Sequence, residues 1–163
     1  MMCGVETDEA LRLARSQVWS DRARAGRHLG AVVGREPVDA VVSALLLDRM
    51  DTAVIDATAQ ALLQRGDAAA LRLLAAAWHV AEPEQADHLS GCWSGALFEL
   101  SCAEPQDRTR FRAVLQSLLS DPYPDTRIPG PGPKICLIEL RGRYRTDRHR
   151  LARPAGAKAL TGS

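Results

Sequence analysis

The sequence predicts an all-helical fold, and three observations support this class. Between Pro37 and Ser120 the apolar residues recur with the 3.6-residue period of an amphipathic helix. Residue types that begin and end helices stand at the boundaries of these periodic segments. Hydrophobic residues make up 46% of the chain and aromatic residues only 4%, so we expect a core of Ala, Leu and Val, which suits close helix packing.

The first three helices are expected over 8–18, over 20–33 and after Pro37. Their expected inward-facing residues are Leu11, Ala14 and Val18, then Ala25, Leu29, Val32 and Val33, then Val38, Val41, Val42, Leu45 and Leu46. Pro37 suits the first turn of a helix because its fixed φ is already helical and its missing N–H is not needed there. The segment after it, 38–48, therefore reads as a short amphipathic helix.

The next two helices have the clearest boundaries. Asp51 is expected to cap a helix that ends at Gly66, a residue able to adopt the left-handed conformation. Asp67 then caps a helix over 68–81. The expected stripes are Val54, Ala57, Thr58, Ala61 and Leu62 on the first helix and Leu71, Leu74, Ala75 and Trp78 on the second. Because a tight turn joins them, the two helices should lie antiparallel and side by side.

Two further helices are expected, opened by Pro83 and by Pro105. Their inner residues are Leu89, Trp93, Ala96, Leu97 and Leu100, then Phe111, Val114, Leu115, Leu118 and Leu119. Gly91 and Gly95 lower the helix propensity of the segment after Pro83. The chain thus predicts seven helices within about 115 residues.

The sequence is similar to itself at a spacing of 32 residues, which predicts that the helices form a repeat. RAGRHLGA from Arg24 aligns with DATAQALL from Asp56, and a second helix follows each segment. The stretch LLLDRMDTAVIDATAQALLQRGDAAALRLLAAA resembles a HEAT repeat, with small residues in its first helix, an Ala-Leu pair and a leucine-striped second helix. It departs from that pattern at Ile55, where an Arg is common. The resemblance covers about residues 16 to 127 and implies a short α-solenoid of about three antiparallel helix pairs, which is a fold and not an activity.

The C-terminal part departs from this pattern. DPYPDTR, from Asp121, is how a further repeat often begins, but Pro129, Pro131 and Pro133 forbid a continuing helix. A short strand could form over 135–140, although one strand would have no partner in a helical protein. We therefore expect a helical repeat domain over 1–127 and a largely disordered tail over 128–163.

Charge is divided unevenly between the two parts. Residues 1–126 carry 12 basic and 18 acidic side chains, whereas 127–163 carry 9 basic and 2 acidic ones. Tail residues suited to contact nucleic acid are Arg141, Arg143, Tyr144, Arg145 and Arg148. Three interpretations of this tail stay open: it binds nucleic acid, it docks on an acidic surface of its own chain or of a partner, or it is the product of a reading-frame change that truncated a longer solenoid.

The sequence gives only weak signals for a metal site or for a site that recognises nucleic-acid bases. His88 and Cys92 are four residues apart, with His79 and Cys102 nearby in sequence, but a structural zinc site usually shows two close ligand pairs. Trp19, Trp78 and Trp93 suggest an analogy to DNA glycosylases built on HEAT-like repeats. Trp78 and Trp93 lie on apolar stripes, which favours a core role, and the acidic body is a poor cradle for phosphates. We expect neither a metal nor a cofactor.

The sequence therefore favours a non-catalytic scaffold that binds another protein. It contains no GxSxG, HExxH or phosphate-binding loop motif. If second helices line a concave face, the expected partner-contacting residues are Arg72, His79, Arg108 and Arg112. The alternative is a nucleic-acid-binding protein, or a HEAT-like DNA repair glycosylase, that gains affinity from the basic tail.

The cellular context follows from composition. Arg outnumbers Lys nineteen to two, which indicates a GC-rich bacterial genome. The four cysteines show no close pairing, so reduced thiols are expected. No segment is long and apolar enough for a membrane span, and the acidic N-terminal residues do not resemble a signal peptide, so a cytoplasmic location is expected.

Overall fold

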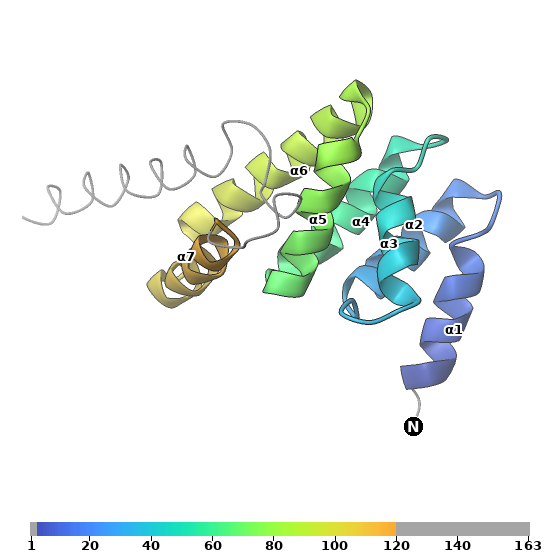
Figure 1. Cartoon of the computed structure of the whole chain (residues 1–163), viewed down its shortest axis with the longest axis horizontal. Helices are drawn as coiled ribbons and strands as arrows, with labels where there is room; N and C mark the ends of the chain where they lie inside the picture. The colour runs from blue at the N-terminus through green and yellow to red at the C-terminus, as the bar shows by residue number, and fades with distance from the viewer. Residues whose placement is uncertain (1–2, 120–163) are drawn as a thin grey trace, which may run out of the picture.

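The computed structural model describes residues 3–119, and every regular element in this range is an α-helix (Figure 1). The helices are α1 (Cys3–Leu13), α2 (Trp19–Gly30), α3 (Val38–Leu46), α4 (Thr52–Arg65), α5 (Ala68–Val80), α6 (Pro83–Cys102) and α7 (Pro105–Leu119). The predicted helical class and the seven predicted helices are thus confirmed within the described range. None of these helices is long and apolar enough to cross a membrane. The predicted tail, 128–163, lies outside the described residues.

Helices α4 and α5 begin and end where their capping residues predict. The Asp51 carboxylate accepts a hydrogen bond from the Ala53 N–H, and the Asp67 carboxylate accepts one from the Ala70 N–H. Gly66 ends α4 at φ 62°, a left-handed conformation that favours glycine. The αα-hairpin at the centre of the chain is therefore encoded by local signals.

The two N-terminal helices differ from their predicted bounds. The prediction of 8–18 for the first helix is wrong by about five residues, because α1 covers Cys3–Leu13, and Val18 is 53% exposed instead of inward-facing. Ser16 explains the early stop: its Oγ accepts from the Val18 N–H and donates to Asp21, which favours a turn over a continuing helix. The second helix ends at Gly30 instead of residue 33, although Val33 is buried as predicted.

Helix α4 packs between α2 and α6, and α5 contacts both α3 and α7. Helix α1 packs on α2 at the N-terminal end. The starts of α2, α4 and α6 are 33 and 31 residues apart, close to the period of 32 in the sequence.

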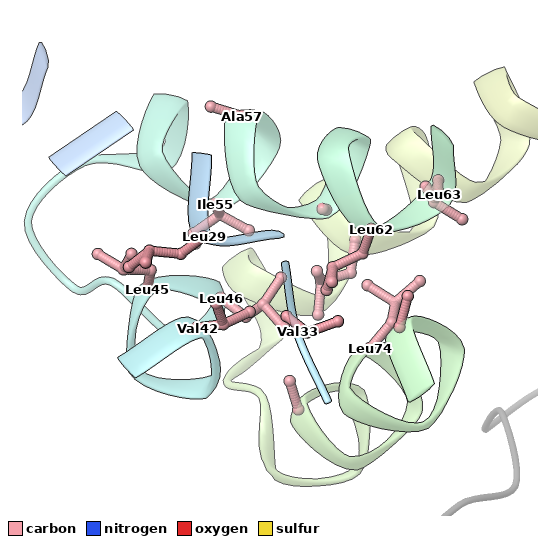
Figure 2. Close-up of a cluster of buried hydrophobic side chains, with 14 of the residues drawn as sticks. Leu29, Val33, Val42, Leu45, Leu46, Ile55, Ala57, Leu62, Leu63 and Leu74 are labelled. Atoms are coloured by element: carbon pink, nitrogen blue, oxygen red, sulfur yellow. The ribbon is translucent and has the colours of Figure 1, made fainter. Parts of the chain in front are cut away.

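The hydrophobic core lies between the helices. Leu29, Val42, Leu62 and Leu74, from four different helices, point toward a common interior in Figure 2 and are fully buried. Burial of each such side chain stabilises the fold by about 1.5–3 kcal/mol. Ile55, the departure from the HEAT pattern, is also fully buried, because α4 is covered by α2 and α3.

Helices α2 and α4 approach closely through small residues. A Cβ added to Gly26 would lie 2.1 Å from Thr58 Oγ1, and one added to Gly30 would lie 2.8 Å from Ala61 Cβ. Both distances are shorter than real Cβ contacts. The Gly26–Gly30 spacing of four residues places both glycines on the face of α2 that meets α4, so this interface leaves no room for a side chain at either position.

A buried ion pair ties α2 to the turn before α4. Arg22 donates from Nε to Asp48 at 2.7 Å, and both side chains are about nine-tenths buried. Burial alone would raise the pKa of Asp48. Hydrogen bonds from Arg22 and from the N–H groups of Met50 and Asp51 outweigh that effect and hold the pKa below its ordinary value.

Candidate binding cleft

A cleft of about 830 Å³ opens between α4, α6 and α7. Helix α4 contributes Gln60 and Gln64, α6 contributes Gly91 and Gly95, and α7 contributes Phe111. A volume of this size is in the range of pockets that hold ligands. The cleft thus lies on the side of α4 that faces away from α2.

The cleft exists because α6 is fastened to the preceding helix pair mainly through its first half. Glu82, just before α6, pairs with Arg49 at 2.9 Å, and Gln85 donates to the Leu47 carbonyl at 2.9 Å. His88 lies 3.0 Å from the Asp56 carboxylate. The lining of the cleft, in contrast, continues along α6 to its last turn and to Ala103. From Gly91 onward, one face of α6 therefore forms an open wall of the cleft, while Trp93 on another face of the helix is buried.

Two glycines lie on this open wall. Gly91 and Gly95 are exposed, and a Cβ added to either one would meet no atom within 4 Å. Each glycine in a helix interior costs about 0.5–1 kcal/mol relative to Ala. No contact within the described chain requires their small size, whereas Gly26 and Gly30 are required by α4.

The cleft carries an excess of negative charge. Its acidic residues are Asp56, Asp87, Glu99 and Asp107, and its basic ones are Arg65 and Arg110. Arg65 is engaged, because it donates to Asp67 at 2.7 Å and to the Ala31 carbonyl at 3.0 Å. The field in the cleft therefore attracts cations and repels phosphates.

At one end of the cleft, Asp56 joins His88 and Cys92. The Cys92 thiol donates to Asp56 Oδ1 at 3.5 Å, and His88 Nδ1 lies 3.0 Å from the same oxygen. Burial, with a contribution from the Asp56 charge, raises the pKa of Cys92 to about 12. Cys92 is therefore a protonated thiol at neutral pH, which does not suit a nucleophile.

The metal-ligand spacing in the sequence does not correspond to a joint site. His88 and Cys92 share Asp56, but Cys102 is exposed at the end of α6 and His79 is exposed on α5. Within residues 3–119 no group of three or more His, Cys, Asp or Glu is arranged to hold a metal ion. The pair of side chains instead fastens α6 to α4.

The predicted partner-contacting residues lie elsewhere. Arg72 and His79 are exposed on α5, while Arg108 and Arg112 are half-buried on α7, where Arg108 donates to the Ser101 carbonyl at 3.5 Å. None of the four is among the residues that line the cleft. The predicted tail contacts, Arg141, Arg143, Tyr144, Arg145 and Arg148, lie outside the described residues.

The three tryptophans have different environments. Trp93 is buried, and the centroid of its ring lies 6.1 Å from that of Phe111. Trp78 is partly buried and packs against the core. The predicted core role is thus confirmed for these two. Trp19 and Val18 are about half-exposed, and Met50 and Val80 are more exposed. All four lie in or beside the turns that precede α2, α4 and α6.

Sequence reasoning missed the cleft and the role of Asp56. One available signal was the period of 32 in the sequence, since Asp56 and His88 are 32 residues apart. A second signal was the pair of glycines in α6, which were noted only for their cost in helix propensity. The cleft itself depends on how far α6 diverges from α4, which no local pattern encodes.

Comparisons with protein-family models, with curated proteins and with solved structures found no match to this chain. The geometry and the charge of the cleft are therefore the features that bear on function.

Proposed function

We propose that this chain is a non-catalytic protein-binding module of the HEAT-repeat type, whose acidic cleft takes a basic polypeptide segment. The observation that carries the proposal is the open wall of α6, where Gly91 and Gly95 leave room beside the acidic residues of α4, α6 and α7. Grooves between helices commonly bind peptide segments, with charge selecting the partner.

The arrangement of the helices supports the repeat assignment. The pairs α2 with α3, α4 with α5, and α6 with α7 follow one another, and each first helix packs on the next first helix. Stacked helix pairs of this kind make extended binding surfaces and need no catalytic centre. The protonated Cys92 thiol also gives no support to nucleophilic catalysis in the cleft.

A nucleic-acid-binding function is the alternative, and the segment RGRYRTDRHR at 141–150 is the observation that favours it. The acidic cleft does not suit a phosphate backbone. Under this alternative, DNA affinity depends on the tail, falls steeply with salt and is indifferent to changes in the cleft.

The test uses fluorescence anisotropy with a labelled peptide of sequence RGRYRTDRHR and, separately, a labelled single-stranded DNA. The protein is the full chain with Arg141, Arg143, Arg145 and Arg148 changed to Gln, hereafter the tail-neutral chain. These changes remove the net positive charge of residues 141–150, so that this segment does not compete. We expect Asp87→Lys with Glu99→Lys to weaken peptide binding at least about tenfold, because two attractive charges become repulsive.

The matched control is Glu6→Lys with Asp8→Lys, which makes the same charge change on exposed residues of α1. It should alter peptide affinity by less than about twofold. Equal losses from both pairs, or no peptide binding by the tail-neutral chain, would contradict the proposal. If only the variant Trp19→Ser with Met50→Ser lost peptide binding, the binding surface would lie at the turns and not in the cleft.

A further inference from the structure

We propose that the chain's own basic segment, residues 141–150, occupies the acidic cleft and competes there with other basic partners. This inference rests on the proposed function, because it assigns an occupant to the same cleft. The segment would act as an internal competitor that an external partner must displace.

Charge complementarity is the first argument. The segment contains five arginines and one acid, and the cleft contains four acids against two arginines, one of which is engaged with Asp67. The same opposition holds for the whole chain, since the acidic excess of residues 1–126 is balanced by the basic excess of 127–163. Opposite charges on tethered parts of one chain attract without the translational entropy cost of joining two separate molecules.

The shape of the cleft is the second argument. Arginine side chains are long, so a segment rich in them docks best where its backbone can approach the wall and its side chains can reach acids on either side. The α6 wall offers that approach at Gly91 and Gly95, with Asp87 and Glu99 one turn beyond on either side. Phe111, half-buried in the cleft, offers an apolar contact for Tyr144.

The length of the connecting chain is the third argument. Residue 120 directly follows α7, and α7 itself forms one wall of the cleft through Asp107, Arg110 and Phe111. The 21 residues from 120 to 140 span up to about 70 Å when extended and about 25 Å as a flexible chain. Helix α6 is about 30 Å long, so the segment can reach every part of the cleft.

Tethering makes the contact effective even when the intrinsic affinity is modest. A tether of this order of length gives an effective concentration of about 1 mM. A segment that binds with an intrinsic dissociation constant of about 10–100 μM would then occupy the cleft in most molecules and weaken an external basic peptide about 10- to 100-fold.

The experiment measures binding of the labelled RGRYRTDRHR peptide to the unaltered full chain and to the tail-neutral chain at low salt. We expect the tail-neutral chain to bind the peptide at least about tenfold more tightly. The control is a full chain with Arg15, Arg24, Arg27 and Arg35 changed to Gln, four exposed body arginines outside the cleft whose loss changes net charge equally. It should bind the peptide as weakly as the unaltered chain.

The other outcomes separate the two proposals. Equal peptide affinity for the unaltered and tail-neutral chains would overturn self-docking and leave the proposed function intact. Failure of both chains to bind the peptide would overturn the proposed function and, with it, self-docking. Equal tightening by the tail-neutral and body-arginine variants would show a general charge effect, which also overturns self-docking.

Discussion

Helix α4 packs between α2 and α6, and it meets them in opposite ways. On the α2 side, Gly26 and Gly30 press against Thr58 and Ala61, so the interface is filled. On the α6 side, two glycines with the same four-residue spacing, Gly91 and Gly95, face open space. The same small-residue spacing thus closes one interface and leaves a binding wall at the other.

The contacts around the glycines account for the difference. Arg22, within α2, reaches the turn before α4 through a buried ion pair, and the packed glycines follow along the same helix. The hydrogen bonds from Gln85, His88 and Cys92 hold the first half of α6, and beyond them one face of the helix lines the cleft. A first helix that is fastened along its length completes a core, whereas one that is fastened at one end opens a cleft.

The largest effect is expected from the buried ion pair on the closed side. Asp48→Asn should lower the free energy of unfolding at pH 7 by about 3 kcal/mol, because it leaves the Arg22 charge buried without its partner. In the unaltered chain the pKa of Asp48 is lowered on folding, so its contribution is present at neutral pH. That contribution is lost as the pH falls from the ordinary value through the lowered pKa.

Urea unfolding between pH 3 and pH 7 measures this effect. The difference between the Asp48→Asn variant and the unaltered chain should shrink as the solution becomes more acidic. A constant difference across that range would show that Asp48 does not act through its charge.

A methyl group on the closed face of α2 is expected to have the next largest effect. Gly26→Ala should cost about 2 kcal/mol, since the overlap with Thr58 outweighs the gain in helix propensity. Adding Thr58→Ala removes the Oγ1 that the new methyl would strike and should recover part of the loss. Chemical unfolding of both single variants and the double variant measures this coupling, and strictly additive losses would contradict the close packing.

The smallest effect, of opposite sign, is expected on the open face. Gly91→Ala and Gly95→Ala should each raise the free energy of unfolding by about 0.5–1 kcal/mol, because the added methyl meets nothing and the helix gains propensity. Thermal or urea unfolding of the two single variants checks this, with Gly26→Ala as the matched change on α2. Destabilisation by either α6 change would mean that this wall is packed in solution.

Local signals predicted the elements well where capping residues are strong. Asp51, Gly66 and Asp67 define the central hairpin, and all three act as predicted. Before α2 the signal was ambiguous: Val18 fits an apolar stripe, but Ser16 bonds to its backbone and ends the helical path. Side-chain competition for backbone groups of this kind overrides periodicity.

The candidate site was harder to predict because it depends on contacts between helices that are far apart in the sequence. The sequence predicted that second helices carry the binding surface, with Arg72 and Arg112 among the contacting residues. That prediction is untested. The cleft is instead lined mostly by α4 and α6. The divergence of α6 reflects which of its residues find partners on α4, and Asp56 is one such partner. Only the repeat period connects Asp56 to His88 in the sequence.

The measurement that tests the central claim most directly is the peptide affinity of the tail-neutral chain carrying Gly91→Gln with Gly95→Gln. Glutamine keeps the charge and favours the helix, but its side chains fill the α6 wall. We predict that peptide binding weakens at least about tenfold while the free energy of unfolding does not fall. Unchanged affinity in a folded variant would contradict the assignment of the cleft between α4 and α6 as the binding site.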